Sequence, residues 1–384
     1  MAARVSEESK IVQWRGRMSS GGAMVGRRWL VAALLALVVL PAARAYMVSG
    51  IPSCRRGPRS APTRKCALWM AARQKQRRRQ NVEGEFYVCE GCIDCGSCRW
   101  LAPETFSLLG TKSVVSRQPE SEEDMTRAVQ AMATCPTGSI RTETPLPLAK
   151  QVTQRGVMRE IDPLRIPGVY QLGYHQFNSM GAAPFFITRT GGNVMVDVPR
   201  YSRLLAEALE ALGGVDYLVL TNKNGAAQHD RWKAHFPDCV RVLHRHDMRD
   251  DTTDVEQILD GLGPWELEDA KDADLRILHT PGYTFGSLSI WHRSGSGHGV
   301  VFPGGNIKVN ARSGTALAFS ALTTGDLTPQ VRSLRRLADP ETCGDWVWLL
   351  PPRGPPKCYD SPELARKEIN AAATSLEEDG RTLY

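Results

Sequence analysis

Four cysteines recur at every third position in "CEGCIDCGSC", residues 89–98. Three thiolates at this spacing can surround three corners of an iron–sulfur cluster, and the fourth ligand must then come from elsewhere in the chain. Cysteine pairs with two intervening residues also occur in redox motifs and in zinc sites. Structural zinc held by four cysteines is therefore the alternative that would use the same residues.

A remote cysteine is available in "ATCPTGSI", where Cys135 is followed at once by Pro136. The remote ligand of bacterial-type clusters is typically such a Cys-Pro pair, in which proline turns the chain away from the cluster. A two-cluster protein would carry another cysteine four residues after Cys98, and this chain has Ala102 there. We therefore expect one 4Fe-4S cluster, with a 3Fe-4S form as the alternative.

The segments "CIDCGSCRWLAPETF" and "CPTGSI" resemble a single-cluster bacterial-type ferredoxin domain over roughly residues 84–143. The match includes an Ala-Pro-Glu-x-Phe segment that starts at Ala102. This segment decides which three of the four closely spaced cysteines align with the ligands of the family. Cys89 is then not one of the four ligands. We interpret it as a small buried residue, or else as a ligand that can replace one of the four or as a redox partner. The resemblance implies an α+β ferredoxin-like fold and an electron-transfer partner, a reductase or a ferredoxin-type donor. The implied cluster ligands are Cys92, Cys95, Cys98 and Cys135.

The formal charge of +7 hides a division along the chain. Residues 1–80 hold 17 of the 48 basic residues and 2 of the 41 acidic ones, a net charge of +15 that leaves −8 for the rest. The basic excess belongs to a predicted leader, largely disordered, so the body of the protein gives no reason to expect a nucleic acid partner.

The leader reads as a targeting segment. A basic start, an apolar run from Trp29 to Leu40 and an Ala-Arg-Ala sequence are typical of a signal peptide, and Met24 is an alternative start. The apolar run is too short to span a bilayer, so we expect no membrane span in the mature protein. The Arg-rich stretch that follows resembles the two-part targeting of algae with complex plastids. We predict a plastid protein, with secretion as the alternative, because thiolates fare badly in an oxidising lumen.

A second domain is predicted over residues 161–360, after a linker at 144–160 and before a C-terminal helix or tail at 361–384. "FFITRTGGNVMVDVPR" indicates two strands joined by a Gly-Gly turn, and "YSRLLAEALEALGG" an amphipathic helix that ends in glycine. Further apolar strands follow, each running into a Gly- or Asn-rich loop. This alternation indicates a layered α/β architecture.

The order of these elements is similar to the metallo-β-lactamase fold, a four-layer αββα sandwich with metals at the strand-end loops, over roughly residues 166–356. The whole arrangement resembles a plant and algal family that fuses a bacterial-type ferredoxin to such a domain. Asp197 in "NVMVDVPR" matches the first motif of that fold, and His279 matches the histidine of its His-Thr-Pro-Gly turn.

The metal ligands that this resemblance implies are mostly absent. The Thr-His-x-His-x-Asp-His loop is replaced by "LTNKNGAAQHD", in which only His229 matches a histidine that the ferredoxin-fused family keeps. Neutral amides are weak metal ligands, alanine and glycine supply none, and an arginine would repel a cation. We therefore expect no zinc or iron in this domain. The residues at the lost ligand positions are Asn222, Asn224, Ala226, Ala227, Tyr283, Gly305 and Arg353.

Three residual candidates for a reduced metal site remain: His229, His279 and Asp197. Each has a structural interpretation: a capping histidine, an imidazole satisfied by a backbone carbonyl, and a carboxylate that fixes the loops. His244 and His246 lie two residues apart, but a pair without a third ligand does not make a metal site.

Three hypotheses about function follow from these residues, and the sequence leaves open whether the chain is an enzyme. The first is a one-electron iron–sulfur redox protein whose second domain is non-hydrolytic and serves as a docking or ligand-binding surface, with Arg353 available to bind a small anion. The alternative is a metal-dependent hydrolase or oxygenase with a reduced metal site. A third hypothesis, a cluster that only stabilises the small domain, differs from the first in having no reversible reduction.

Overall fold

The computed structural model describes residues 75–146, 158–267, 274–319 and 326–381. The predicted leader lies outside these residues except for its last six positions, and so does most of the predicted linker. No helix in the described part of the chain is long and apolar enough to cross a membrane. The leader and its plastid destination stay predictions.

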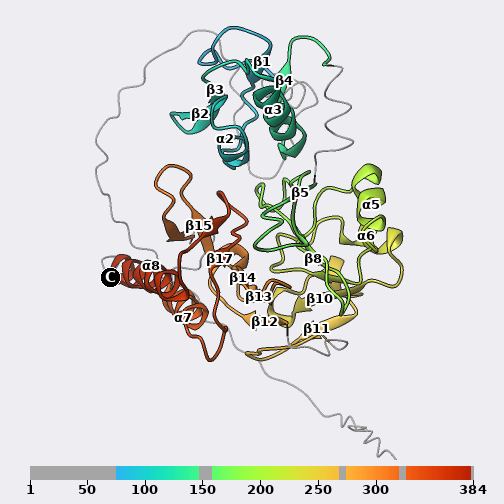
Figure 1. Ribbon diagram of the computed structural model, residues 1–384, viewed down its shortest axis with the longest axis vertical. Helices are drawn as coiled ribbons and strands as arrows, with labels where there is room; N and C mark the ends of the chain where they lie inside the picture. The colour runs from blue at the N-terminus through green and yellow to red at the C-terminus, as the bar shows by residue number, and fades with distance from the viewer. Residues whose placement is uncertain (1–74, 147–157, 268–273, 320–325, 382–384) are drawn as a thin grey trace, which may run out of the picture. The chain divides into compact units, whose positions relative to one another are not determined.

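The N-terminal domain, residues 75–146, consists of two small sheets and two helices (Figure 1). β1 pairs antiparallel with β4, and β2 and β3 form a hairpin. α3 begins after Ser121, whose hydroxyl accepts a hydrogen bond from the Asp124 N–H at 3.0 Å and so caps the first turn. The bounds are β1 Phe86–Val88, α2 Ser97–Leu101, β2 Phe106–Leu109, β3 Lys112–Val115, α3 Glu122–Thr134 and β4 Ile140–Thr142.

Some residues of the predicted leader and linker take part in backbone pairing. The Arg78 N–H donates to the Val88 carbonyl at 3.1 Å, so the folded part begins inside the predicted leader over residues 1–80. At the other end, β5 starts at Met158, so the predicted linker over residues 144–160 overlaps the next domain by the three residues of that strand. These backbone hydrogen bonds show where folded structure begins, and amino-acid composition does not reveal them.

The sandwich domain, residues 158–381, contains a seven-stranded sheet in the order β11-β10-β9-β8-β7-β6-β5. Strands β8 to β11 run parallel, and β5 to β8 are antiparallel neighbours. Every residue of β7, β8 and β9 is buried, as expected for strands that are covered on both faces. The bounds are β5 Met158–Glu160, β6 Val169–Leu172, β7 Phe185–Ile187, β8 Val194–Val196, β9 Tyr217–Val219, β10 Val240–His244 and β11 Gln257–Leu259.

A five-stranded sheet in the order β12-β13-β14-β17-β18 makes up the second half of this domain. β12, β13 and β14 are antiparallel, and β17 joins β14 in parallel. A separate hairpin consists of β15 and β16. The bounds are β12 Leu275–His279, β13 Leu288–Arg293, β14 Gly299–Phe302, β15 Ile307–Val309, β16 Ala316–Ala318, β17 Trp348–Leu349 and β18 Lys357–Cys358.

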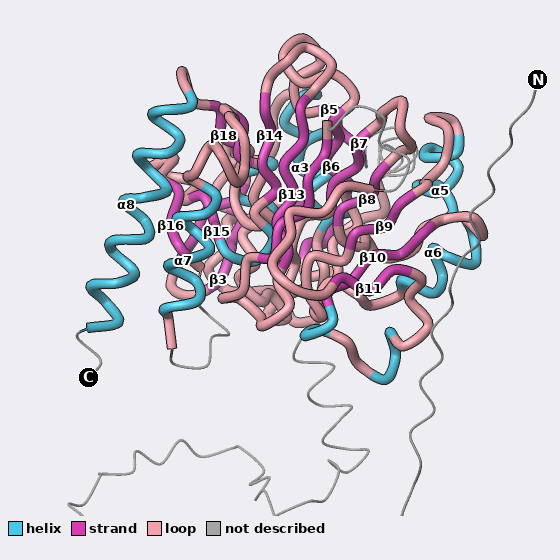
Figure 2. The backbone as a smooth tube through the Cα atoms, turned by 90° about the horizontal axis from the view of Figure 1, so that it is seen from below, coloured by secondary structure: helices cyan, strands magenta, loops and turns pink. Residues whose placement is uncertain are grey.

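The two large sheets pack face to face, because one apolar core contains side chains of both, such as Val219 and Ile290. A second core joins the outer face of the seven-stranded sheet to α5 and α6, and a third joins the five-stranded sheet to α7 and α8. Figure 2 shows these helix pairs on opposite sides of the strands. The bounds are α5 Arg203–Glu210, α6 His229–His235, α7 Thr328–Leu337 and α8 Pro362–Arg381, with short 3-10 turns at Arg245–Asp247, Asp250–Thr252 and Gly304–Asn306.

Candidate metal centre

The four predicted ligands of the cysteine motif line one small cavity in the N-terminal domain. Cys92 and Cys95 come from the loop before α2, Cys98 lies in α2, and Cys135 follows α3. Apolar side chains, including Ile93 and Ile140, line the same cavity. The sequence spacing and the fold therefore bring four thiols from two distant segments to one place.

The end of α3 presents Cys135 to this cavity. Cys135 has φ −56° and ψ 119°, outside the helical region, as expected for a residue that precedes proline. Its own N–H still donates to the Ala131 carbonyl at 3.0 Å. The helix thus ends at Thr134, and the chain after Pro136 continues along the cavity, where Thr137 and Ser139 line it.

Hydrogen-bonding groups contact three of the four sulfurs, those of Cys95, Cys98 and Cys135. The Ser139 N–H donates to the Cys135 Sγ at 3.3 Å, and the Cys98 Sγ lies 3.3 Å from the Ser113 hydroxyl. Ser97 bonds to Cys95 through both its backbone N–H and its side chain. Burial raises the pKa values of the Cys95 and Cys98 thiols, and the charges of the neighbouring cysteines raise them further. Bare thiolates are therefore unfavourable here unless cations share the cavity.

Among the described residues, no three cysteine sulfurs lie as close together as the ligands of a single zinc ion. Tetrahedral zinc with bonds of about 2.3 Å holds its sulfurs about 3.8 Å apart. Among the described residues, the groups of three or more ligand atoms that lie within 4.8 Å of one another include no cysteine. All eight cysteines in the described ranges are free thiols, as iron ligation requires.

Cys89 lies apart from this cavity. It is buried, and its Sγ donates to the Ser139 carbonyl at 3.1 Å. A thiol that is already bonded to the backbone in this way agrees with the interpretation of Cys89 as a small buried residue.

At the strand ends of the sandwich domain, Asp197 directly follows β8. Its Oδ1 accepts hydrogen bonds from the Thr221 N–H at 2.8 Å and from the Thr221 hydroxyl at 2.9 Å. Burial raises the pKa of this carboxyl to about 6, although the Thr221 hydrogen bonds oppose the shift. Asp197 therefore holds the β9 loop in place.

Both ring nitrogens of His229 also have hydrogen-bond partners within the protein. Its Nδ1 accepts from the Arg241 guanidinium at 2.9 Å, so its Nε2 carries the proton and donates to the Asp251 carbonyl at 2.8 Å. Neither ring nitrogen has a free lone pair for a metal. The structure does not join His229 to Asp197 or to His279 in one group of ligands.

The side chains of Tyr283, Phe319 and Arg353 fill the space around three of the positions where predicted ligands are absent, 283, 305 and 353. A Cβ atom on Gly305 would lie 2.1 Å from Cδ1 of the buried Tyr283 ring. That ring stacks on Phe319 with centroids 5.9 Å apart, and the Arg353 guanidinium lies 4.9 Å from the Phe319 centroid. Arg353 also donates to the Met180 and Ser179 carbonyls at 2.7 and 2.8 Å. Its Nη atoms are thus engaged with the backbone, which disfavours the small-anion role that the sequence suggested.

His279 has different neighbours from those that the sequence suggested. It forms a group with His244 and His246, whose ligand atoms all lie within 4.8 Å of one another. The His279 Nε2 donates to the Phe285 carbonyl at 2.8 Å, and its buried Nδ1 has no hydrogen-bond partner. The rings of His279 and His244 stack at 3.8 Å with an interplanar angle of 9°. Their in-plane lone pairs therefore run side by side rather than toward one point.

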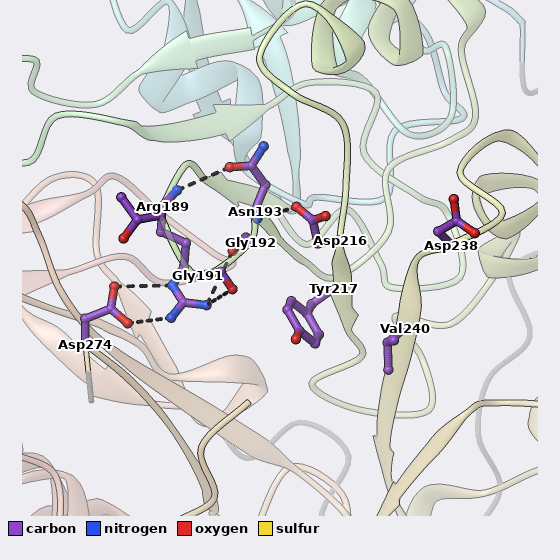
Figure 3. A pocket seen from close by; sticks show the side chains of 10 residues that line it. Arg189, Gly191, Gly192, Asn193, Asp216, Tyr217, Asp238, Val240 and Asp274 are labelled. Atoms are coloured by element: carbon purple, nitrogen blue, oxygen red, sulfur yellow. Dashed lines mark hydrogen bonds and ion pairs between the residues drawn. The ribbon is translucent and has the colours of Figure 1, made fainter. Parts of the chain in front are cut away.

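A cavity of about 680 Å³ lies elsewhere in the sandwich domain (Figure 3). Its walls come from the Gly191–Gly192 turn and from the first residues of β9 and β10, the edge of the parallel strands opposite to Asp197 and His244. Arg189 is buried in its wall and binds both carboxylate oxygens of Asp274, at 2.5 and 3.3 Å. Asp274 directly follows residues 268–273 in the sequence, which the structure does not describe, and we assign no site to the cavity.

Sequence reasoning missed the residues of the sandwich domain that contact the cysteine site. They lie in the cover loop, residues 173–184 between β6 and β7, and at Arg200 after β8. The His175 N–H donates to the Thr134 carbonyl at 3.2 Å, and Gly181 packs against Cys95. No local pattern in the sequence signals these contacts, because they join positions 40 to 90 residues apart.

Comparison with protein families identifies the class of the first domain. Residues 89–142 match the family described as the 4Fe-4S single cluster domain of Ferredoxin I. All four cavity cysteines lie in this segment, and the chain therefore joins a ferredoxin-type domain to a two-sheet α/β domain. No curated protein matches the sequence of this chain.

Among solved structures, the chain is similar to several metallo-β-lactamases. DIM-1 metallo-β-lactamase exposed to ceftazidime is 13% identical at a TM-score of 0.42, with 57% of this chain and 96% of that chain covered. BJP-1, a subclass B3 metallo-β-lactamase of Bradyrhizobium japonicum, is 16% identical at a TM-score of 0.39, over 59% and 93%. TMB-1 is 14% identical at 0.43, over 57% and 97%. Similarity at this level carries no conclusion about activity.

Proposed function

We propose that this protein is a one-electron iron–sulfur redox protein with a single 4Fe-4S cluster. The observation that carries the proposal is the convergence of four thiols on one cavity, within a segment that matches a 4Fe-4S single-cluster family. A bound cluster of this type would supply reversible one-electron transfer. The expected partner is an electron-transfer protein, a reductase or a ferredoxin-type donor. The proposed ligands are Cys92, Cys95, Cys98 and Cys135.

The surrounding residues have defined roles in this proposal. The Ser139 N–H and the Ser97 and Ser113 hydroxyls contact the sulfurs and stabilise their negative charge. Ile93 and Ile140 line the cavity and limit the access of water. Both effects influence the reduction potential of a cluster.

The sandwich domain, in this proposal, is a four-layer αββα domain of metallo-β-lactamase type that does not hydrolyse a substrate and serves as a docking or ligand-binding surface. A hydrolytic site needs at least three ligands and an open position for water. Tyr283, Phe319 and Arg353 leave little space at the strand ends, and both nitrogens of His229 are bonded within the protein.

The test is analysis of the purified full chain, before and after anaerobic reconstitution with iron and sulfide. We expect a brown protein with about four irons and four acid-labile sulfides per chain, and visible absorbance that bleaches with dithionite and returns on reoxidation. A colourless protein that contains one zinc ion would contradict the proposal. A brown protein that cannot be reversibly reduced would point instead to a cluster with a purely structural role.

A second candidate function, a metal-dependent enzyme with a reduced site, has one observation in its favour. The buried Nδ1 of His279 has no partner, and His244 and His246 lie within reach of it. Ligation by both His279 and His244 requires the stacked rings to turn apart, because the lone pair of an imidazole nitrogen lies in the plane of its ring.

Cobalt(II) titration of the apo protein separates the two candidates. Our proposal predicts no stoichiometric visible cobalt band from the sandwich domain. A band with one equivalent that disappears in His279→Ala but persists in His298→Ala, an exposed histidine in the loop after β13, would favour the enzyme.

A further inference from the structure

The cover loop of the sandwich domain contacts the cysteine site at the ligand Cys95 and at Pro136, the residue after Cys135. A Cβ atom on Gly181 would lie 2.5 Å from Cβ and 3.1 Å from Sγ of Cys95, and 3.2 Å from Cγ of Pro136. Gly181 has a φ of +78°, a conformation that costs other residues free energy. The backbone of the sandwich domain thus approaches the sulfurs as closely as only glycine allows.

A buried hydrogen-bond chain connects the same loop to the Cys95 sulfur. The His175 Nδ1 lies 3.0 Å from the Gly181 carbonyl and 3.1 Å from the Ser97 hydroxyl, and the Ser97 side chain bonds to Cys95. Because the Gly181 carbonyl can only accept, the Nδ1 carries the proton. Burial lowers the pKa of His175 to about 3, so this ring is a neutral donor. It holds the Ser97 hydroxyl in place between the two domains.

Arg200 brings a positive charge to the other ligand, Cys135. Its Nη2 donates to the Ala133 carbonyl at 3.0 Å and to the Cys135 carbonyl at 3.3 Å, and its Nε donates to the His175 carbonyl at 3.0 Å. Burial lowers the pKa of Arg200 while attraction to Cys135 raises it, and an arginine keeps its charge under such shifts. The ion pairs of the described residues give Arg200 no carboxylate partner.

A fixed charge at this place acts on the reduction potential. One electron from an external donor makes the cysteine site more negative by one unit, and no bond is made or broken. A nearby cation stabilises the reduced state more than the oxidised one, by Coulomb attraction in a partly buried environment.

We propose that Arg200 of the sandwich domain is a positioning residue that raises the reduction potential of the cluster, and that the Ser97 hydroxyl held by His175 acts in the same direction. This inference rests on the proposed function. It also gives the sandwich domain a definite role: it completes the environment of a site whose ligands all lie in the other domain.

The experiment is a potentiometric titration of the reconstituted full chain, followed by visible absorbance and by electron paramagnetic resonance. Arg200→Gln removes the charge and keeps a planar donor group. At the wild-type midpoint potential we expect its ratio of reduced to oxidised cluster to be about tenfold lower, which corresponds to ~59 mV for a one-electron couple. The matched control is Arg203→Gln on α5, because Arg203 is exposed and pairs with Glu207; its midpoint should equal that of the wild type.

Two further variants separate charge from packing. Arg200→Lys keeps the charge, so its midpoint should lie closer to the wild type than that of Arg200→Gln. Ser97→Ala removes the hydroxyl next to Cys95 and should shift the midpoint in the same negative direction by a smaller amount; it also tests the inference if Arg200→Gln does not take up a cluster.

The outcomes distinguish this inference from the proposed function. A wild-type protein without reversible reduction would overturn both. A reversible wild type with Arg200→Gln at the same midpoint as Arg203→Gln would overturn the inference alone, and so would an Arg200→Lys midpoint as negative as that of Arg200→Gln.

Discussion

The cysteine cavity and the strand-end loops of the sandwich domain differ in what happens to their polar groups. In the cavity, four thiols face one another, and burial raises the pKa of two of them. At the strand ends, by contrast, Asp197 binds Thr221, and His229 binds Arg241 and the Asp251 carbonyl. A group that binds a metal needs a lone pair without an internal partner. A thiolate sulfur has several lone pairs and keeps some beside a hydrogen bond, whereas both ring nitrogens of His229 are bonded within the protein.

Space distinguishes the two regions as well. The cysteines line a cavity, whereas the position of the lost ligand at Gly305 is covered by the Tyr283 ring. A ligand side chain placed at position 305 would overlap with the Tyr283 ring. Protein interiors are close-packed and tolerate little added volume, so a single substitution would not make room for it. A ligand restored at position 305 would therefore need space that the Tyr283 ring occupies.

The largest expected effect tests the ligand set of the cavity. Cys135→Ala should abolish the visible absorbance and lower the iron content to near zero, because one corner of the cluster would have no thiolate. Cys89→Ala is the matched control, since Cys89 is buried in the same domain and lies outside the cavity. Iron analysis after identical reconstitution measures the difference. Loss of iron from Cys89→Ala together with retention of iron in Cys135→Ala would overturn this assignment of the four cluster ligands.

The second prediction tests whether the strand-end region is filled. Gly305→Ala places a methyl group 2.1 Å from an atom of the Tyr283 ring, and we expect it to lower the free energy of unfolding by about 3 kcal/mol. The same change in a Tyr283→Ala background should cost less than about 1 kcal/mol, because the opposing ring is gone.

Urea unfolding followed by tryptophan fluorescence provides these values. Gly295→Ala serves as the control, since a Cβ atom there meets nothing within 4 Å. Equal costs of Gly305→Ala in both backgrounds would show that the Tyr283 ring does not fill this space.

The third prediction concerns the contact of the cover loop with the cavity. Gly181→Ala and Gly110→Ala both place alanine at a positive φ, +78° and +67° respectively, which costs about 1–2 kcal/mol in each. Only at Gly181 does the new methyl group meet another residue, Cys95. We expect Gly181→Ala to lose its cluster several-fold faster in the presence of an iron chelator. Equal rates of loss in the two variants would mean that the domains do not pack as described.

The last prediction is a pH dependence at Asp197. Burial raises the pKa of this carboxyl from 3.8 to about 6 in the folded protein. Between about pH 4 and pH 6 the folded form therefore holds a proton that the unfolded chain has released, so the free energy of unfolding falls as the pH rises, by at most roughly 3 kcal/mol. Asp197→Asn should lack this component.

The measurement is the urea midpoint of both proteins at several pH values from 4 to 7. Other titrating groups contribute equally to the two curves, and the difference between them isolates Asp197. A constant difference across this range would show that the carboxyl is ionised throughout.

Much of the cysteine site could be predicted from the sequence, because its chemistry is local. The predicted ligands are recognised by their spacing alone: three cysteines three residues apart, and a Cys-Pro pair farther along the chain. The structure places all four cysteines on one cavity. The loss of ligands at the strand ends was equally visible, since alanine and glycine cannot bind a metal wherever they lie. The partner of His279 was not visible, because His244 lies on another strand and only sheet packing stacks the two rings.

The sequence by itself predicted which cysteines could bind a cluster and which ligands of the resembled fold are absent, since side-chain chemistry and short-range spacing do not depend on the rest of the fold. Only the tertiary structure decided what surrounds these residues. Tyr283 covers Gly305, and His175, Gly181 and Arg200 reach the cysteine site from another domain. Such contacts join segments far apart in the chain, and they arise from how whole sheets and loops pack rather than from any local pattern.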